Sequence, residues 1–444
     1  MFKIFSRFKN FLGSYWFLRL LALPIFLLVL PFFYIFFYSF YQRELSKISP
    51  QSQIFFLALD QYGVILQLLF YVRCWGNNRN NTIIVVFTPQ VGLIKALAKH
   101  ICPDSIIVAP PIILHSSIHR LFGVFSRFFI FTPLYYKFSV EYPEALYINE
   151  TRKDNKSGYV KYLDDVYVSR GKISPFWDAY VQTRNVFDCR YDVTQDFFRL
   201  AKVSNRIGVK SDLSRDLLLN LNISGKYVVL NINVKDYGHL NQNSRRIFFP
   251  QRYNILIDHL IKAGFTVVLQ GAGEQPHFSP RKGFIDYAHS SFQSPVNDLA
   301  LFNGCEFFVS SKSGTEWYGL ICDKPILGLN YTELTSMQPS VRFRFFPKRI
   351  RDEFGNILPW QFVLSDPVYF QLGRTSPSRQ KFQIVEMEEF EIIAALDEFL
   401  QLLPLPRDKW LCYSPLQIDF KNLTHPGHLD LFYISGVPCD AYLK

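Results

Sequence analysis

Short apolar runs alternate with segments of helical spacing along much of the chain, and this alternation restricts the fold more than any other feature. The clearest run, KYVVLNIN at 226–233, is typical of a strand buried on both faces. In this half the expected strands are 226–233, 265–270, 284–286, 305–310 and 325–329, and the expected helices are 211–222, 252–263, 296–302 and 314–322. Strands that alternate with helices predict βαβ units around a parallel sheet.

The first half repeats the alternation over a shorter stretch. Its expected strands are 53–59, 82–87 and 105–109, and its expected helices are 64–74 and 92–101. A chain of 444 residues has room for two such domains and an N-terminal appendage. We therefore expect an N-terminal domain at 51–205, a C-terminal domain at 206–400 and a C-terminal extension at 401–444.

The segment before these domains contains an uncharged run, LLALPIFLLVLPFFYIFFYSFY, at residues 20–41. A helix of this length reaches about 33 Å at 1.5 Å per residue, which is enough to cross the hydrocarbon core of a bilayer. The run is too long for a signal peptide and ends in bulky aromatic residues. We expect a membrane anchor within residues 1–50. Pro24 and Pro31 favour a bend, so a spanning and a re-entrant helix both fit the run.

Charge and cysteine content restrict the partners. The formal net charge of +11 favours an anionic membrane surface or a phosphate-bearing ligand. No nucleic-acid-binding motif is present and most basic residues are dispersed, so we expect no nucleic-acid partner. The seven cysteines form no C-x-x-C pair, and the nine histidines have no ligand spacing, so we expect no metal site.

The strongest local motif is FFVSSKSGTE at 307–316, which places small hydroxyl residues and a glycine between an expected strand and an expected helix. The first amides of a helix have no intrahelical partner, so a diphosphate can bind there, with Ser311, Ser313 and Thr315 adding hydrogen bonds. The alternative is that Ser313 or Thr315 only caps the helix. The position after a parallel strand favours the ligand.

Weaker candidates lie in other loops. In QGAGE at 270–274, Gly271 and Gly273 permit close approach of a ligand, although such glycines are also typical of plain turns. Glu274 and Glu316 can bind a ribose diol or remain solvated. The candidates for a general base are Asp60, Asp236 and His239. Asp60 also fits the simpler role of capping a turn.

A family resemblance runs through the second half, from about 211 to 350. It is carried by YVVLNINVKDY at 227–237, AGFTVVLQGAGE at 263–274, FIDYAHS at 284–290, the stretch at 297–334, and RFFPKRI at 344–350. These segments resemble, in order and spacing, a family of bacterial glycosyltransferases of cell-surface polysaccharide assembly, distantly similar to heptosyltransferases of GT-B type. The resemblance implies an α/β fold of two Rossmann-like domains, which the membrane helix precedes.

The resemblance also implies the site residues. It assigns the donor to the C-terminal domain and the acceptor to the N-terminal domain. By position, the donor-binding residues are Gly271, Gly273, Glu274, Ser310, Ser311, Ser313, Gly314, Thr315, Glu316, Arg344, Lys348 and Arg349.

The function expected from these patterns is metal-independent transfer of a sugar from a nucleotide-sugar substrate to a glycan or lipid-linked acceptor, with no cofactor. The alternative is a membrane-anchored, non-catalytic protein that retains the fold and binds a glycan or an assembly partner. Because nucleotide sugars are made in the cytosol, we expect the domains on the cytoplasmic face of the bacterial inner membrane. Four basic residues before Leu20 oppose a straight span with that orientation, and a helix bent at Pro24 or Pro31 resolves the conflict.

Overall fold

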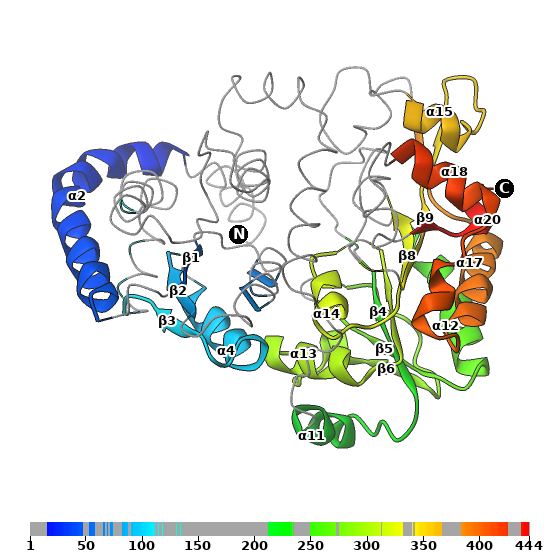
Figure 1. Ribbon diagram of the computed structural model, residues 1–444, viewed down its shortest axis with the longest axis horizontal. Helices are drawn as coiled ribbons and strands as arrows, with labels where there is room; N and C mark the ends of the chain where they lie inside the picture. Colours follow the sequence, from blue (N-terminus) through cyan, green and yellow to red (C-terminus); the bar gives the residue numbers. More distant parts are fainter. Residues whose placement is uncertain are drawn as a thin grey trace, which may run out of the picture. The chain divides into compact units, whose positions relative to one another are not determined.

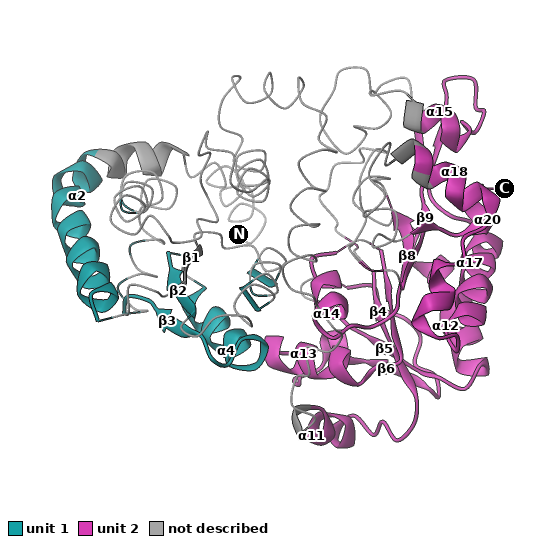
Figure 2. Ribbon diagram, in the orientation of Figure 1, with its two compact units in different colours: residues 1–201 teal, residues 202–444 magenta. Residues whose placement is uncertain are grey.

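The computed structural model contains two compact units, residues 1–201 and 202–444 (Figures 1 and 2). The residues that the structure describes are 16–47, 53–57, 65–66, 69, 72–73, 82–87, 90–111, 114, 118, 130, 134, 212–232, 234, 249–271, 275–311, 313–331, 340, 342–365, 383–424 and 437–443. The division into an anchor, two domains and an extension stays a prediction.

The second unit is built on a seven-stranded sheet in which every neighbouring pair is parallel. Its strand order is β12-β9-β8-β7-β4-β5-β6. The strands are β4 (Tyr227–Asn231), β5 (Thr266–Leu269), β6 (Phe284–Asp286), β7 (Phe307–Ser310), β8 (Ile326–Tyr331), β9 (Phe343–Pro347) and β12 (Val437–Pro438). The predicted α/β class with a parallel sheet is confirmed, and the five strands expected in this half are all present.

Helices cover both faces of this sheet (Figure 1). One layer contains α12 (Tyr253–Lys262), α17 (Glu389–Leu402) and α20 (Asp440–Leu443), and the other contains α13 (Pro295–Gly304) and α14 (Glu316–Ile321). A further helix, α11 (Asp212–Asn220), packs on α13, where the Ser214 hydroxyl donates to the Ala300 carbonyl at 2.9 Å. Because both faces are covered, the central strands β4, β7, β8 and β9 are buried throughout, whereas the edge strand β6 is only partly buried.

The order of the strands reverses once. From β4 the chain adds β5 and β6 on one side, and it then returns to add β7, β8 and β9 on the other side. These six strands therefore have the 3-2-1-4-5-6 order of a doubly wound Rossmann sheet. In such sheets ligands bind outside the carboxyl ends of the strands where the order reverses, which here is between β4 and β7.

The last part of the chain completes the second unit. The strand β12 pairs with β9, and the Cys439 amide donates to the Phe345 carbonyl at 2.8 Å. Residues 401–444, expected as an extension, thus supply one strand of the main sheet. The remaining elements are η2 (Pro250–Arg252), η3 (Tyr287–His289), β10 (Arg349–Arg351), α15 (Trp360–Ser365), β11 (Gln383–Val385), η5 (Arg407–Leu411) and α18 (Pro415–Thr424).

The first unit contains a parallel sheet of order β1-β2-β3 in the described residues. Its strands are β1 (Gln53–Leu57), β2 (Thr82–Val86) and β3 (Ile106–Val108), and α4 (Val91–Ile101) connects the last two. The helix buries Val91, Ile94, Leu97 and Ile101, which recur at helical spacing. The predicted strand–helix–strand pattern is confirmed for this stretch.

The N-terminal apolar run lies in α2 (Trp16–Leu45), which continues through Pro24 and Pro31 as a curved helix (Figure 1). Among the described residues, α2 is the one helix long and apolar enough to cross a membrane, by length and composition alone. One side of it packs on the sheet: Phe37 and Tyr41 join a buried cluster with Ile83 and Val85, and the Tyr41 hydroxyl donates to the Val86 carbonyl at 2.5 Å.

The other side of α2 is apolar and exposed. We call this surface the apolar stripe of α2, and it consists of Ile25, Leu28, Phe32, Ile35 and Phe36, which are 40–76% exposed. These residues recur at helical spacing, so they lie on one face of the helix. The helix therefore has one face in the core of the first unit and one face without protein cover in the described residues.

Candidate functional site

The carboxyl ends of β4 and β7 meet where the strand order reverses. Asn231 and Ser310 are the last residues of these strands and are paired in register. The backbone continues this pairing, because the Ser311 amide donates to the Asn231 carbonyl at 3.1 Å. The hydroxyl-rich loop at 310–316 thus begins directly beside Asn231.

Two buried amide side chains lie at this edge. Asn231 is 3% exposed and Gln270 is fully buried. The Asn231 side-chain amide donates to the Gln270 backbone carbonyl at 2.9 Å and to Gln270 Oε1 at 3.1 Å. Asn231 Oδ1 and Gln270 Nε2 have no hydrogen-bond partner among the described residues. A buried polar atom without a partner costs about 1–3 kcal/mol, so this edge lacks one acceptor and one donor that a bound molecule would supply.

Glu316 organises the loop from within. Its carboxylate is buried and accepts from the Ser310 hydroxyl at 2.6 Å and from the Ser313 amide at 3.0 Å. The Ser313 hydroxyl contacts the Thr315 hydroxyl at 2.5 Å and accepts from the Thr315 amide at 3.3 Å. The structure therefore places Glu316 inside the loop as its internal acceptor, whereas Gly314 is at the exposed surface.

Gly271 lies at the same edge, directly after β5. A Cβ atom at this position would meet the end of the flexible Gln275 side chain, which would have to move aside. The Gly271 carbonyl accepts from the Gln293 side chain, which fixes the start of the loop. Gly273 and Glu274 lie outside the described residues, as do the base candidates Asp60, Asp236 and His239.

The basic residues in and after β9 bind other parts of the second unit. Arg344 is 1% exposed, donates to the Trp410 carbonyl at 2.7 Å, and has its guanidinium 5.3 Å from the centre of the Trp410 ring. Burial lowers the pKa of Arg344. The side chain thus fastens β9 to η5 inside the second unit.

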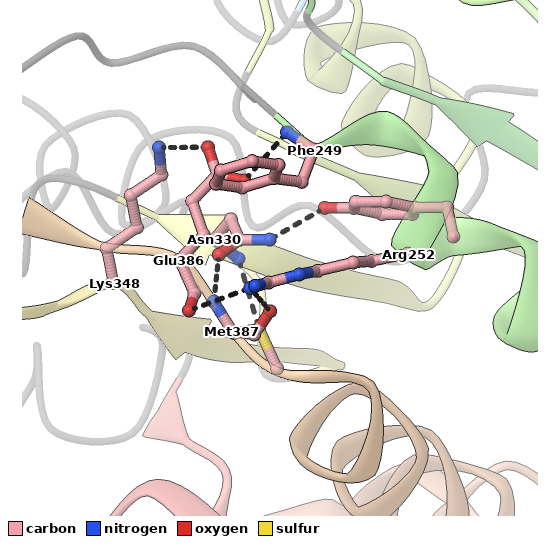
Figure 3. Close-up of polar contacts among 7 residues, drawn as sticks. Phe249, Arg252, Asn330, Lys348, Glu386 and Met387 are labelled. Atoms are coloured by element: carbon pink, nitrogen blue, oxygen red, sulfur yellow. Dashed lines mark hydrogen bonds and ion pairs between the residues drawn. The ribbon is translucent and has the colours of Figure 1, made fainter. Parts of the chain in front are cut away.

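Lys348 is also internal (Figure 3). Its ammonium group lies 3.1 Å from Glu386 Oε1, and the side chains of both residues are almost fully buried. The other carboxylate oxygen of Glu386 accepts from the Phe249 amide at 3.2 Å. Burial lowers the pKa of Lys348, although the negative charge of Glu386 opposes this change.

The same network ties three parts of the chain together (Figure 3). Arg252 donates to the Met387 carbonyl at 2.9 Å, and the Met387 amide donates to Asn330 Oδ1 at 2.8 Å. Asn330 adopts a positive φ of 56° where the β8–β9 register shifts, and its side-chain amide reaches the Tyr253 hydroxyl at 3.1 Å. The network joins α12, β8 and the segment before α17.

Arg349 is half-buried and pairs with Glu391 at 2.7 Å. Each of the three basic residues predicted to bind the donor therefore has a partner inside the second unit. Their partners come from 386–391 and 410, far away in sequence, which is why the pattern of residues 344–350 did not reveal them. Gln270 was missed for a related reason, since a polar residue that ends an apolar strand resembles the start of a turn.

Neither a protein-family model nor a curated protein matches the sequence. Among solved structures, a glycosyl transferase family 9 protein from Veillonella parvula is 10% identical, with a TM-score of 0.41 over 80% of this chain and 98% of its own. E. coli ADP-heptose lps heptosyltransferase II is 13% identical, with a TM-score of 0.39 over 67% and 90%. E. coli heptosyltransferase WaaC with ADP is 12% identical, with a TM-score of 0.32 over 62% and 86%. All three TM-scores are below 0.5, and all three sequence identities are 13% or less.

Proposed function

We propose that the chain is a glycosyltransferase that binds a nucleotide-sugar donor at the carboxyl edge of the second unit's sheet, between β4 and β7. The observation that carries the proposal is the reversal of strand order between Asn231 and Ser310, next to two buried polar atoms, Asn231 Oδ1 and Gln270 Nε2, that have no partner among the described residues. Open α/β sheets bind their ligands at this point. The resemblance of residues 211–350 to glycosyltransferases supplies the class of ligand.

The loop at 310–316 is assigned the donor diphosphate. Its hydroxyl groups at Ser311, Ser313 and Thr315 supply hydrogen bonds, and Glu316 holds the loop in shape through Ser310 and the Ser313 amide. Hydrogen bonds to a charged ligand are stronger than those between neutral groups. In this assignment the leaving diphosphate is stabilised by positioned protein donors without a metal ion.

The general base is assigned to the segment that follows β4. Asp236 and His239 lie on the chain that leaves the sheet at the β4 carboxyl end, and either side chain has the chemistry to accept a proton from a hydroxyl of the acceptor. Asp60 stays the candidate from the first unit. The glycan or lipid-linked acceptor belongs to the first unit in this proposal.

A membrane location for the acceptor is supported by the apolar stripe of α2. The exposed face of this helix carries five large apolar residues, and exposed apolar patches of this kind mark contacts with lipid or protein. We assign the stripe to the cytoplasmic face of the bacterial inner membrane, where cytosolic nucleotide sugars and lipid-linked acceptors meet. The packed face of α2 then keeps the first unit at the bilayer surface.

The proposal is tested by nucleotide binding. The full chain in detergent is screened by thermal shift against UDP-, GDP-, ADP- and CMP-sugars, and we expect one nucleotide class to raise the melting temperature. Replacing Ser313 and Thr315 together by Val should weaken that binding by about 1 kcal/mol for each lost hydroxyl.

The matched control is Ser279→Val, which changes an exposed serine of the same unit and should leave the affinity unchanged. Circular dichroism establishes that both variants are folded. An unchanged affinity in the folded double variant would remove the loop from the donor site. Binding of the nucleotide sugar with neither release of free nucleotide nor sugar transfer to any acceptor would favour the non-catalytic alternative.

A further inference from the structure

Three side chains with metal-binding chemistry converge at the edge strand of the second unit. They are His277, Asp286 and His289, and one ligand atom from each lies within 4.8 Å of the others. His289 Nδ1 lies 2.7 Å from Asp286 Oδ1, and the rings of His277 and His289 stack with centroids 4.1 Å apart.

The fold fixes two of these residues on one short segment. Asp286 is the last residue of β6 and is paired in register with Leu269 of β5. The following turn, η3, returns the His289 amide to Asp286 Oδ1 at 3.3 Å, so both side chains are held at the carboxyl end of β6.

His277 arrives from a different segment, after the glycine loop at 271–275. Its neighbour Phe278 is buried and packs edge-to-face on Phe284 of β6, with ring centroids 5.9 Å apart. This contact holds His277 over His289 although the two are separated along the chain. The ring of His277 is exposed and stacks on the ring of His289.

The surroundings are compatible with a cation. Of the two basic residues between His277 and Asp286, Arg281 is held by Asp258 at 2.5 Å and by Asn254, so its charge is already paired, and Lys282 is exposed to solvent. All three candidate ligands are partly exposed, which gives an ion access from solvent. Two imidazoles and one carboxylate form a donor set that suits zinc and its neighbours in the transition series.

We propose that His277, Asp286 and His289 bind a divalent transition-metal ion of the zinc type, with one coordination position left for water or another oxygen ligand. Binding requires the stacked rings of His277 and His289 to turn so that one nitrogen of each faces the ion. The ion then replaces the hydrogen bond between His289 and Asp286 and ties the segment that follows the glycine loop to β6. In the strand order the site lies two strands from β4, about 10 Å at the usual spacing. It is therefore separate from the proposed diphosphate loop and does not depend on that assignment.

The test uses the full chain, purified without a histidine tag and stripped with chelator. Titration with Zn²⁺ should reveal one high-affinity ion per chain. Replacing any one of His277, Asp286 and His289 by Asn should weaken binding at least tenfold, since even changes outside the ligand set cost about 10–100-fold. Co²⁺ should give visible absorption bands without the intense charge-transfer band of a cobalt–thiolate bond, which excludes the free cysteines as ligands.

The matched control is His259→Asn, a half-exposed histidine that pairs with Asp397 on another surface and should leave Zn²⁺ affinity unchanged. Zn²⁺ should also raise the melting temperature of the unaltered protein but not of His277→Asn. Equal Zn²⁺ affinity in the unaltered protein and all three variants, or no binding at all, would overturn the proposal. Nucleotide-sugar affinity is measured on the same samples, so a failed metal site and a failed donor site give different results.

Discussion

The β4–β7 edge and the basic stretch of β9 and β10 lie in the same unit, and the sequence predicted donor binding at both. At the first, Asn231 Oδ1 and Gln270 Nε2 are buried without a partner among the described residues. At the second, Arg344, Lys348 and Arg349 each have a partner within the unit. The β4–β7 edge thus retains two polar atoms without a partner among the described residues, whereas Arg344, Lys348 and Arg349 each hold parts of the second unit together.

The difference follows from what each region must bury. A charge that enters the interior needs a partner, because its desolvation costs several kcal/mol. Lys348 and Arg344 therefore require Glu386 and Trp410, whatever their role toward a ligand. A neutral amide such as Gln270 loses less on burial, so a fold tolerates it without a full set of partners.

The largest expected effect tests the structural role of the basic stretch. Replacing Lys348 by Met leaves Glu386 buried without its cation, and we expect the free energy of unfolding to fall by about 3–5 kcal/mol. Urea denaturation measures this change. Nucleotide affinity, measured under conditions where the variant is folded, should stay the same.

Two controls sharpen this result. Adding Glu386→Gln to Lys348→Met removes the unpaired charge and should restore most of the lost stability. Lys262→Met, at an exposed position of α12, should change stability by no more than about 0.5 kcal/mol. A Lys348→Met protein that is as stable as the unaltered protein but binds nucleotide more weakly would contradict this prediction. It would show that the basic stretch contributes to donor binding.

A smaller effect is expected at the β4–β7 edge. Replacing Glu316 by Gln keeps an acceptor for Ser310 or the Ser313 amide but removes the negative charge that strengthens both bonds. We expect nucleotide affinity to fall by about 1–2 kcal/mol because the loop is less well ordered. Isothermal titration with the nucleotide found in the screen gives the value.

The matched control here is Glu306→Gln, which changes an exposed glutamate just before β7, at the other end of that strand.

Replacing Arg349 by Ala extends the comparison to the basic stretch. Nucleotide affinity should stay unchanged. The free energy of unfolding should fall by less than about 1 kcal/mol, as expected for a partly exposed ion pair. Equal losses of affinity in Glu316→Gln and Arg349→Ala would erase the distinction between the two regions.

The smallest effect is a dependence on pH. The pKa of Lys348 is lower in the folded protein than in the unfolded chain, where it is near the ordinary value of about 10.4. Between these two values the unfolded chain binds the proton more tightly, so unfolding takes up a proton and the free energy of unfolding rises with pH. Below this window both states hold the proton and the contribution is constant.

This contribution is isolated by comparison with the Lys348→Met, Glu386→Gln double variant. Buried tyrosines and thiols act in both proteins and cancel in the difference. As the pH rises towards about 10.4, the unaltered protein should gain stability relative to the variant. A relative loss of stability above about pH 10.4 would mean instead that the pKa of Lys348 is raised and that the pair is a strong ion pair.

Much of the second unit's fold was predictable because most of its strands are continuous apolar runs that can be recognised in the sequence. The runs at 226–233 and 305–310 contain β4 and β7, and the bounds differ by at most two residues at either end. The strand β9 was not predicted from its residues, since Arg344 breaks the apolar pattern of Phe343, Phe345 and Phe346. Arg344 can be buried in this strand because Trp410, which is distant in sequence, covers its guanidinium.

The candidate site was predictable in part. The loop at 310–316 follows from a local motif, whereas the inward direction of Glu316 depends on the Ser310 hydroxyl and on how the loop closes. The cluster of His277, Asp286 and His289 has no ligand spacing along the chain because β6 and the Phe278–Phe284 contact bring its members together. Residues that tertiary packing brings together need not follow any regular spacing in the sequence.

The two faces of α2 have a practical consequence for producing this protein. Deleting residues 1–47 is the obvious way to remove an apolar segment and gain solubility. Because Phe37, Tyr41 and Leu45 belong to the same buried cluster as Ile83 and Val85, the deletion would uncover that cluster and take the Tyr41 hydroxyl from the Val86 carbonyl. The deletion would thus remove the apolar stripe of α2 but expose the apolar cluster beneath the helix. We therefore expect better-behaved protein from a preparation that keeps α2 and covers its exposed face with detergent.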